Sequence, residues 1–438
     1  MGEDGDLLRV EPGGEVVREQ GVDALADGAD AVAGVNNLIT RRRREGGELF
    51  VSHGNAFDTD AAETHVSLLA GATRGRLALT ARASFFDRHA LASRDRYFSR
   101  TANLVPRFTA TEAYYAALPA AQQAAFDGRS ITGPSARISV AAGQINGQNG
   151  VNIPGLAAGA AITALPGTGG SASGTQASAT PGFTAPFLQG MGGQFSATAA
   201  ASFQAPELTR GDPNARNLYN FNEVFGLVPA ATRAGAGLRL DYETAAGPAA
   251  FLDVSGQRNR SRIDLLAVGI STVVPRTNFY NPFGVDVNVA WRPVETGPRR
   301  SLVESTNLAL LAGLRSAANA DTPWEIAASH GRDAYSDTMA NWLSASKTLA
   351  ALARTDATAL NPFGGPAFRH DAALLESLKV NLRASGRASL TGFDGKVGHE
   401  LATLPGGALH GVLYAEHRRE TYGFGWDTAS LTGDILGR

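Results

Sequence analysis

The chain has no cysteine among its 438 residues. This absence excludes a disulfide scaffold and any metal site built on thiolate ligands. An excess of one charge sign is also missing, because 39 Lys and Arg residues balance 41 Asp and Glu residues to a formal net charge of −2. General nucleic-acid binders carry a large basic excess, so we expect no nucleic-acid partner.

Long apolar runs are missing as well. A membrane-crossing helix needs about 18 consecutive apolar residues, and the best stretch, near 156–165, is shorter and is broken by glycine and proline. The opening residues MGEDGDLLRVEPGGE are acidic and lack the apolar core of a signal peptide. Taken alone, these absences favour a soluble cytoplasmic protein.

The alternation of apolar and polar residues favours a different class. Between 76 and 85, Leu77, Leu79, Ala81, Ala83 and Phe85 alternate with Arg76, Ala78, Thr80, Arg82 and Ser84. A period of two is typical of a strand with two unlike faces. The pattern recurs and predicts nine strands, near 46–54, 62–73, 76–86, 232–244, 248–258, 304–317, 323–334, 378–403 and 408–422.

The lengths of the connections sort by parity. Every second connection is short and holds turn residues, as at 73–75, 245–248, 319–323 and 404–407. Between them lie long loops near 87–230, 259–303 and 335–377, and a first connection of middling length near 55–61. Tight turns at one end and long loops at the other are the layout of an outer-membrane β-barrel. A soluble sandwich alternates in the same way, but its loops do not sort by parity.

In a barrel wall, one face of each strand contacts lipid and the other faces the lumen. The apolar face meets lipid, and we expect Arg76, Arg82, Arg239, Asp241, Lys379, Asn381, Arg383 and Glu416 on the opposite face. The eighth strand is expected to bend or bulge between Gly392 and Gly395. Aromatic residues near strand ends fit interfacial girdles, although aromatics also favour strands in general; they are Phe85, Phe86, Trp324, Tyr422, Phe424 and Trp426.

Several segments resemble the TonB-dependent outer-membrane receptors. The stretch ALADGADAVAGVNNLITRRRREGG, residues 24–47, is similar to the end of that family's plug domain; its matching residues are Gly28, Ala31, Ala33, Gly34, Val35, Asn37, Leu38, Ile39, Thr40 and Arg41. Further resemblances follow in the family's order: FFDRHALASRDRYFS at 85–99, YNFN at 219–222, NPFG at 281–284 and 361–364, and LPGGALHGVLYAEHRRE at 404–420.

The resemblance implies a fold and a partner set. It implies an all-β, antiparallel transmembrane β-barrel, of which about nine of 22 strands are present, with a remnant of the N-terminal plug at residues 1–45, barrel at 46–424 and a truncated outer loop at 425–438. The expected partners are outer-membrane lipid, the TonB energy transducer and a small-molecule or oligosaccharide ligand. Signal peptide, TonB box and a whole plug are absent from the sequence, so we expect a fragment of an outer-membrane transporter, inactive by itself.

Catalytic and metal motifs are weak. Ser344 to Lys347 matches S-x-x-K, but its companion motifs are missing. His399-Glu400 lacks the second histidine of a zinc pair. The Arg41 to Arg44 run fits a solvated junction better than a nucleic-acid or anionic-lipid patch. We therefore expect no enzyme, cofactor or metal, and no residue can be assigned to the ligand.

Two questions stay open at this stage. The segment 128–215 is rich in Gly, Ala, Ser and Thr and is expected to be flexible, so it either touches ligand or is merely tolerated in the first long loop. The second candidate function is a secreted or surface β-rich binding module whose strands only imitate a barrel wall.

Overall fold

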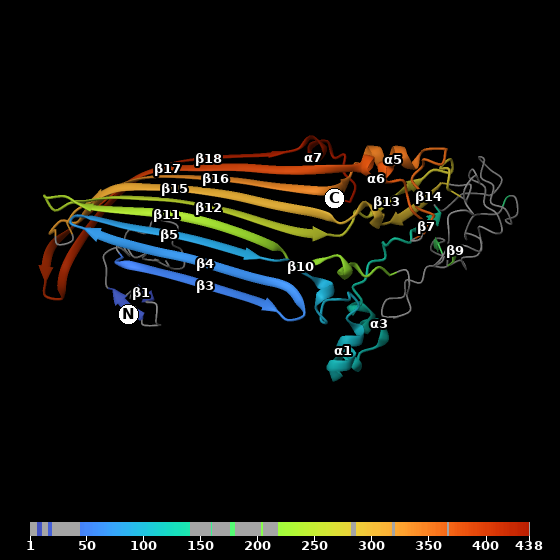
Figure 1. The fold of residues 1–438 in the computed structure, drawn as a ribbon, viewed down its shortest axis with the longest axis horizontal. Coiled ribbons are helices and arrows are strands. Elements are labelled where there is room, and N and C mark those ends of the chain that lie inside the picture. The colour runs from blue at the N-terminus through green and yellow to red at the C-terminus, as the bar shows by residue number, and fades with distance from the viewer. Residues whose placement is uncertain are drawn as a thin grey trace.

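The computed structural model describes residues 44–140, 159, 218–281, 286–317, 320–365 and 368–437, and the short strands at 7–10, 16–19, 176–179 and 203–204. Its main feature is a nine-stranded antiparallel sheet with strand order β18-β17-β16-β15-β12-β11-β5-β4-β3 (Figure 1). The strands are β3 (Gly46–Ala56), β4 (Thr59–Arg74), β5 (Leu77–Arg88), β11 (Ala230–Glu243), β12 (Ala249–Leu265), β15 (Arg299–Arg315), β16 (Trp324–Leu343), β17 (Lys379–Leu404) and β18 (Gly407–Trp426).

Smaller elements lie in the connections. A second sheet has the order β13 (Ile270–Val274), β14 (Val287–Trp291), β7 (Arg137–Val140), β8 (Gln176–Ala179) and β9 (Phe203–Gln204), and two pairs join β1 (Leu7–Val10) to β2 (Val16–Glu19) and β6 (Leu91–Ala92) to β10 (Gly226–Val228). The helices are α1 (Val105–Thr111), α2 (Ala113–Ala116), α3 (Ala120–Gln123), α5 (Ala345–Leu352), α6 (Ala372–Leu378) and α7 (Thr428–Thr432), with single 3-10 turns at Ser93–Asp95, Ala124–Phe126, Phe221–Glu223 and Val294–Thr296.

All nine predicted strands of the main sheet are confirmed. The sorting of the connections holds from β4 onward: the turns predicted to be short lie at one end of the sheet, and the helices and the second sheet lie at the other (Figure 1). The expectation of a middling first connection is wrong. β3 and β4 extend until only Phe57 and Asp58 separate them. Strand pairing uses backbone N–H and C=O groups, so it continues where the side chains become polar.

Two of the tight turns depend on glycine. Gly75 between β4 and β5 has φ +61°, and Gly407 at the start of β18 has φ +129°. These conformations crowd a Cβ atom, and glycine adopts them without that cost. The turn at 404–407 could be predicted from the sequence because it contains the glycine that this conformation favours.

The eighth strand is expected to bend or bulge at Gly392 to Gly395; the bulge is wrong, and the bend stays a prediction. Gly392 and Gly395 of β17 pair without interruption with both β16 and β18. The register instead shifts between Met339 and Trp342 of β16 and β17, and between Glu400 and Ala402 of β17 and β18. Glycine permits a bulge but does not impose one, and here the strand simply continues.

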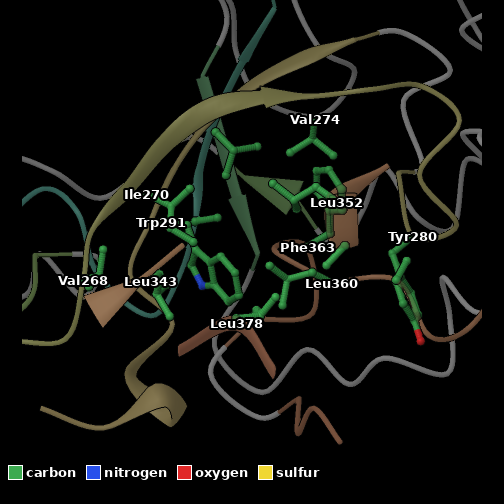
Figure 2. Close-up of a cluster of buried hydrophobic side chains, with 14 of the residues drawn as sticks. Val268, Ile270, Val274, Tyr280, Trp291, Leu343, Leu352, Leu360, Phe363 and Leu378 are labelled. Atoms are coloured by element: carbon green, nitrogen blue, oxygen red, sulfur yellow. The ribbon is translucent and has the colours of Figure 1, made fainter. Parts of the chain in front are cut away.

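A compact core fills the loop end of the sheet. Phe363, Leu343, Leu352 and Leu360 are each at most 1% exposed, and they pack with residues of β13, β14 and α6. Figure 2 shows these side chains converging, and it shows the Tyr280 hydroxyl directed away from them. Burying one such side chain contributes about 1.5–3 kcal/mol, so the loops are held together as a small domain of their own. We call this the loop cluster.

The predicted plug remnant cannot be compared with the structure. Its matching residues, Gly28 to Arg41, lie outside the described residues, as does most of the segment 128–215. The division into plug, barrel and outer loop therefore stays a prediction.

Candidate functional site

The main sheet has two chemically different faces. Residues directly opposite each other in neighbouring strands share a face and form what we call a register row. One row joins Leu79, Leu240, Leu252 and Ala312, and the next joins Thr80, Arg239 and Asp253. We name the first the apolar face and the second the charged face. Leu77, Leu79, Leu238 and Leu310 are exposed on the apolar face, whereas Thr80 and Asp241 are buried on the charged face.

Two predicted placements on these faces are wrong. Arg383 lies opposite Thr338 and Leu302, which puts it, with Asn381 and Lys379, on the apolar face. The reason is that β17 changes its pattern near the loops, where Leu382 and Ala384 turn to the charged face and are buried there. The aromatic side chains at the end of β18 also lie on the charged face, opposite Ala384, Gly386 and Ala388; they are Tyr422, Phe424 and Trp426. They therefore form no lipid-facing girdle.

The apolar face ends at a slanted boundary. Two polar residues, Arg74 of β4 and His399 of β17, lie on this face near the turn ends. Beyond them toward the loops, the first polar residue on this face is His53, Thr64, Asp87, Thr232, Arg258, Thr306, His330, Thr391 and His417, in the order β3 to β18. The first four share one register row. Thereafter the boundary steps toward the turn end by two residues at β12, four at β16 and two at β18.

The slant has the size expected of a tilted barrel wall. The boundary moves eight residues across the eight spacings between nine strands. At about 3.3 Å per residue and about 4.8 Å per strand, it makes an angle of about 35° with the register rows. A planar membrane surface would cut the sheet along such a line if the strands were tilted by the same angle, and barrel strands tilt by about 35–45°.

The charged face holds a connected ion-pair network. The Asp241 carboxylate, 1% exposed, accepts from Arg239 at 2.8 Å and from Arg315 at 2.7 Å. Asp253 pairs with Arg82 at 2.7 Å, and Arg239 lies 3.6 Å from it. The Arg239 and Arg315 guanidinium groups also lie over the Phe251 ring. Four strands, β5, β11, β12 and β15, are thereby joined, and each charge has a partner where an unpaired charge would be costly.

A cleft of about 440 Å³ opens at the edge of the loop cluster. Its lining combines aromatic rings with charged groups; it includes Tyr280, Arg354, Phe368, Arg369, His370 and Asp371. The Tyr280 hydroxyl donates to the Ala357 carbonyl at 2.8 Å, and Arg354 donates to the Thr358 carbonyl at 3.0 Å. The first bond joins the loop of Tyr280 to the loop of Ala357, and the second closes the turn between Arg354 and Thr358.

His370 joins two loops at the back of this cleft. Its Nδ1 lies 2.6 Å from Glu295 Oε2, and its Nε2 accepts from the Asn361 backbone N–H at 3.0 Å. Because Nε2 accepts, Nδ1 carries the proton and the ring is neutral. Burial lowers the pKa of His370 and outweighs the opposing effect of Glu295. Asn361 opens the second NPFG segment, and its Oδ1 accepts from the Phe363 N–H at 2.9 Å, which directs Phe363 into the core.

Sequence reasoning found the loop but not this site. The NPFG segment at 361–364 marked the loop, and most of its counterpart at 281–284 lies outside the described residues. His370, Glu295 and Tyr280 come from three separate segments, and no spacing in the sequence links them. The repeated NPFG was the one available signal in the sequence for this site, because each copy predicts a turn at which neighbouring loops can pack together.

The motif residues weighed for chemistry have other contacts. Ser344 is the N-cap of α5, where it accepts from the Lys347 N–H, and its hydroxyl donates to Asp434 at 2.7 Å. His399 lies near the turn end of β17, 2.9 Å from the Thr322 hydroxyl. Arg44 pairs with Glu48 at 2.9 Å, and Arg41 to Arg43 lie outside the described residues. The structure does not bring these residues together.

The described residues contain neither a membrane-crossing helix nor a cluster of potential metal ligands. No helix there is both long enough and apolar enough to cross a membrane. No three or more His, Cys, Asp or Glu residues in those ranges are placed to share a metal ion.

Comparison with known proteins gives little help. No family model matches the sequence, and no curated protein matches it. Among solved structures, the chain is similar to the ferric-catecholate import receptor Fiu from E. coli K12 in its open form, with 10% identity, a TM-score of 0.21, and coverage of 88% of this chain and 52% of the receptor. The chain thus spans about half the length of that receptor, and the likeness is too slight to assign a family.

Proposed function

We propose that this chain contributes nine strands to the wall of an outer-membrane receptor of the TonB-dependent kind. The observation that carries the proposal is the slanted boundary on the apolar face. A membrane surface is planar and therefore cuts a tilted sheet along a straight slanted line, whereas the surface of a protein partner has no reason to follow such a line. The connections support the orientation. Barrels of the bacterial outer membrane place short turns toward the periplasm and long loops outside.

The outer cleft is the place for a ligand in this proposal. It lies at the loop end, beyond the slanted boundary, and its aromatic and charged lining suits a small molecule with a ring and an anionic group. In such a receptor the ligand is a siderophore, cobalamin, haem or an oligosaccharide, and TonB supplies the energy for its entry. Those steps would require the plug, which lies largely outside the described residues.

Labelling of single cysteines tests the membrane topology. The chain has no native cysteine, so Thr358→Cys in the loop cluster and Gly406→Cys in a tight turn each give one reactive site. With a signal peptide supplied, a membrane-impermeant maleimide should label Thr358→Cys on intact cells and should reach Gly406→Cys only after the outer membrane is opened. Equal labelling of both, or recovery of the chain as a soluble periplasmic protein, would instead favour the secreted binding module.

Ligand binding can be followed through a buried tryptophan behind the cleft. The Trp291 ring lies 5.7 Å from the His370 ring, so its fluorescence should change when the cleft is filled. A panel of ferric siderophores, cobalamin, haem and oligosaccharides should contain a ligand that quenches the wild-type chain and quenches Arg354→Ala much less. The matched control is Arg94→Ala, which removes an exposed arginine from a different loop.

A further inference from the structure

The apolar face becomes strongly basic beyond its slanted boundary. Between β12 and β18 it presents eight exposed arginines on the loop side, which we call the arginine band: Arg258, Arg260, Arg262, Arg300, Arg332, Arg383, Arg387 and Arg419. The acidic residues on the same part of this face are Glu304 and Asp264, and Asp427 follows β18 beside Arg383, where its carboxylate accepts from the Arg383 backbone N–H at 2.8 Å. The chain as a whole has a formal net charge of −2, so the positive charge is concentrated in this place.

The ion pairs inside the band leave most of this charge uncompensated. Glu304 lies 3.2 Å from Arg258 and 3.5 Å from Arg260, so one carboxylate serves two guanidinium groups. Asp264 accepts from Arg300 at 2.8 Å. The Arg258 and Arg260 side chains remain 67% and 59% exposed. Exposed pairs of this kind are weak, and the arginines can therefore turn to another anion.

A hollow of about 650 Å³ lies in the middle of the band. Three arginines, Arg258, Arg383 and Arg387, line it together with one carboxylate, Glu304. Hydroxyl groups come from Thr306, Ser336 and Ser385. Arg258 and Arg387 share one register row and are three strands apart, which is about 14 Å. Arginine binds phosphate through two parallel N–H bonds. Guanidinium groups spread over this distance present donors at more than one point.

We propose that this hollow binds the headgroup of a lipid that carries more than one phosphate. The band borders the apolar surface directly, since Leu308 lies two residues from Thr306 on the same strand and face. Acyl chains can therefore pack on the apolar face while the phosphates contact the arginines. A soluble anion has no acyl chains and would gain nothing from the neighbouring apolar face. The proposal rests on the membrane location proposed above, because a lipid reaches this hollow only if the boundary lies at a membrane surface.

Native mass spectrometry of the full chain in detergent micelles tests the site. The probes are diphosphoryl lipid A, its monophosphoryl form and phosphatidylcholine. We expect the diphosphorylated lipid to bind at least tenfold more tightly than either of the others. The triple variant Arg258→Gln, Arg383→Gln, Arg387→Gln should lose at least tenfold in affinity for it, while Arg76→Gln, Arg94→Gln, Arg418→Gln, which removes the same charge elsewhere, should bind as wild type does.

A lysine triple variant separates charge from geometry and guards against misfolding. Arg258→Lys, Arg383→Lys, Arg387→Lys keeps every charge but loses the paired N–H donors, and we expect binding between that of wild type and the glutamine variant. Equal binding of all three lipids, or unchanged binding by the glutamine variant, would overturn the proposal. So would equally tight binding of inositol hexakisphosphate or a short RNA, since the hollow would then be a site for soluble polyanions.

Failure of this proposal can be told apart from failure of the proposed function. The same preparations are mixed with pure phosphatidylcholine vesicles, and insertion is measured by flotation in a density gradient. A chain that floats but shows no preference for phosphate keeps the membrane wall and loses the lipid site. A chain that stays in the soluble fraction contradicts the membrane wall itself, and the lipid site with it.

Discussion

At the residue scale, His370 links the loops through its neutral form. Nδ1–H donates to Glu295, and Nε2 accepts from the Asn361 N–H. A proton on Nε2 would set two donors against each other, at a site where the imidazole side chain is 3% exposed. Burial therefore lowers the pKa of His370 in the folded chain.

This lowered pKa predicts the sign of a pH effect. A group whose folded pKa lies below its unfolded value contributes stability above the unfolded value, about 6.5 for histidine, and that stability is lost as pH falls through the folded pKa. The loop cluster should thus loosen on acidification from pH 7.5 to 5. Hydrogen exchange of the α6 amides, corrected for intrinsic rates, measures this loosening. The variant His370→Gln should show much less of the pH dependence, and an identical dependence in both proteins would refute the role of His370.

Asp241 makes a second prediction at this scale. It is 1% exposed and is shared by Arg239 and Arg315, so Asp241→Ala leaves two arginines without their partner. Breaking a buried pair in this way costs about 3–5 kcal/mol. The exposed pair of Arg258 with Glu304 gives the control, because Glu304→Gln should cost at most about 1 kcal/mol. Urea unfolding in detergent compares the two variants, and similar losses would argue against a buried network.

At the element scale, alternation predicted every strand of the main sheet but not where each one ends. The alternation located β12 and β16 because several successive residues on one face of each strand are apolar. Beyond the slanted boundary both faces are polar, so the pattern around Arg258 to Arg262 reads as a loop although it is paired strand. The same change of environment explains why Arg383 was placed on the wrong face.

The outer cleft was beyond such reasoning for another physical reason. Its residues are brought together by the packing of Phe363 and Leu360 against β13 and β14, and the contacts join segments about 75 residues apart, as for His370 and Glu295. Local pattern carries no information on such contacts. The repeated NPFG pointed to the loops, and only the fold shows which side chains meet there.

A pair of substitutions on β5 tests the two faces at this scale. Leu79→Arg places a charge on the apolar face within the segment that faces lipid, where the cost is at most about 2–4 kcal/mol. Ser84→Arg places the same side chain on the charged face, opposite Gly235, and should be tolerated. The measurement is the amount of each variant recovered in purified outer membranes. If both variants assemble equally well, lipid does not cover the apolar face.

At the scale of the whole molecule, a tilted membrane wall requires that one plane cut all nine strands obliquely. A single register row illustrates the consequence. Ala81, Leu238 and Leu310 lie in the same row as His330 and Thr391. If the strands stood upright, all five would lie at one depth. With a tilt of about 35°, the first three lie within lipid and the last two lie above it.

Spin labels attached along this row measure that difference directly. Single cysteines at Ala81, Leu238, Leu310, His330 and Thr391 are labelled with a nitroxide in the full chain reconstituted into vesicles, and the accessibility of each label to oxygen and to a water-soluble nickel complex is compared. We expect high oxygen and low nickel accessibility at the first three positions and the reverse at His330 and Thr391. Uniform accessibility along the row, or free access of nickel to Leu310, would contradict the claim that this sheet is a tilted membrane wall.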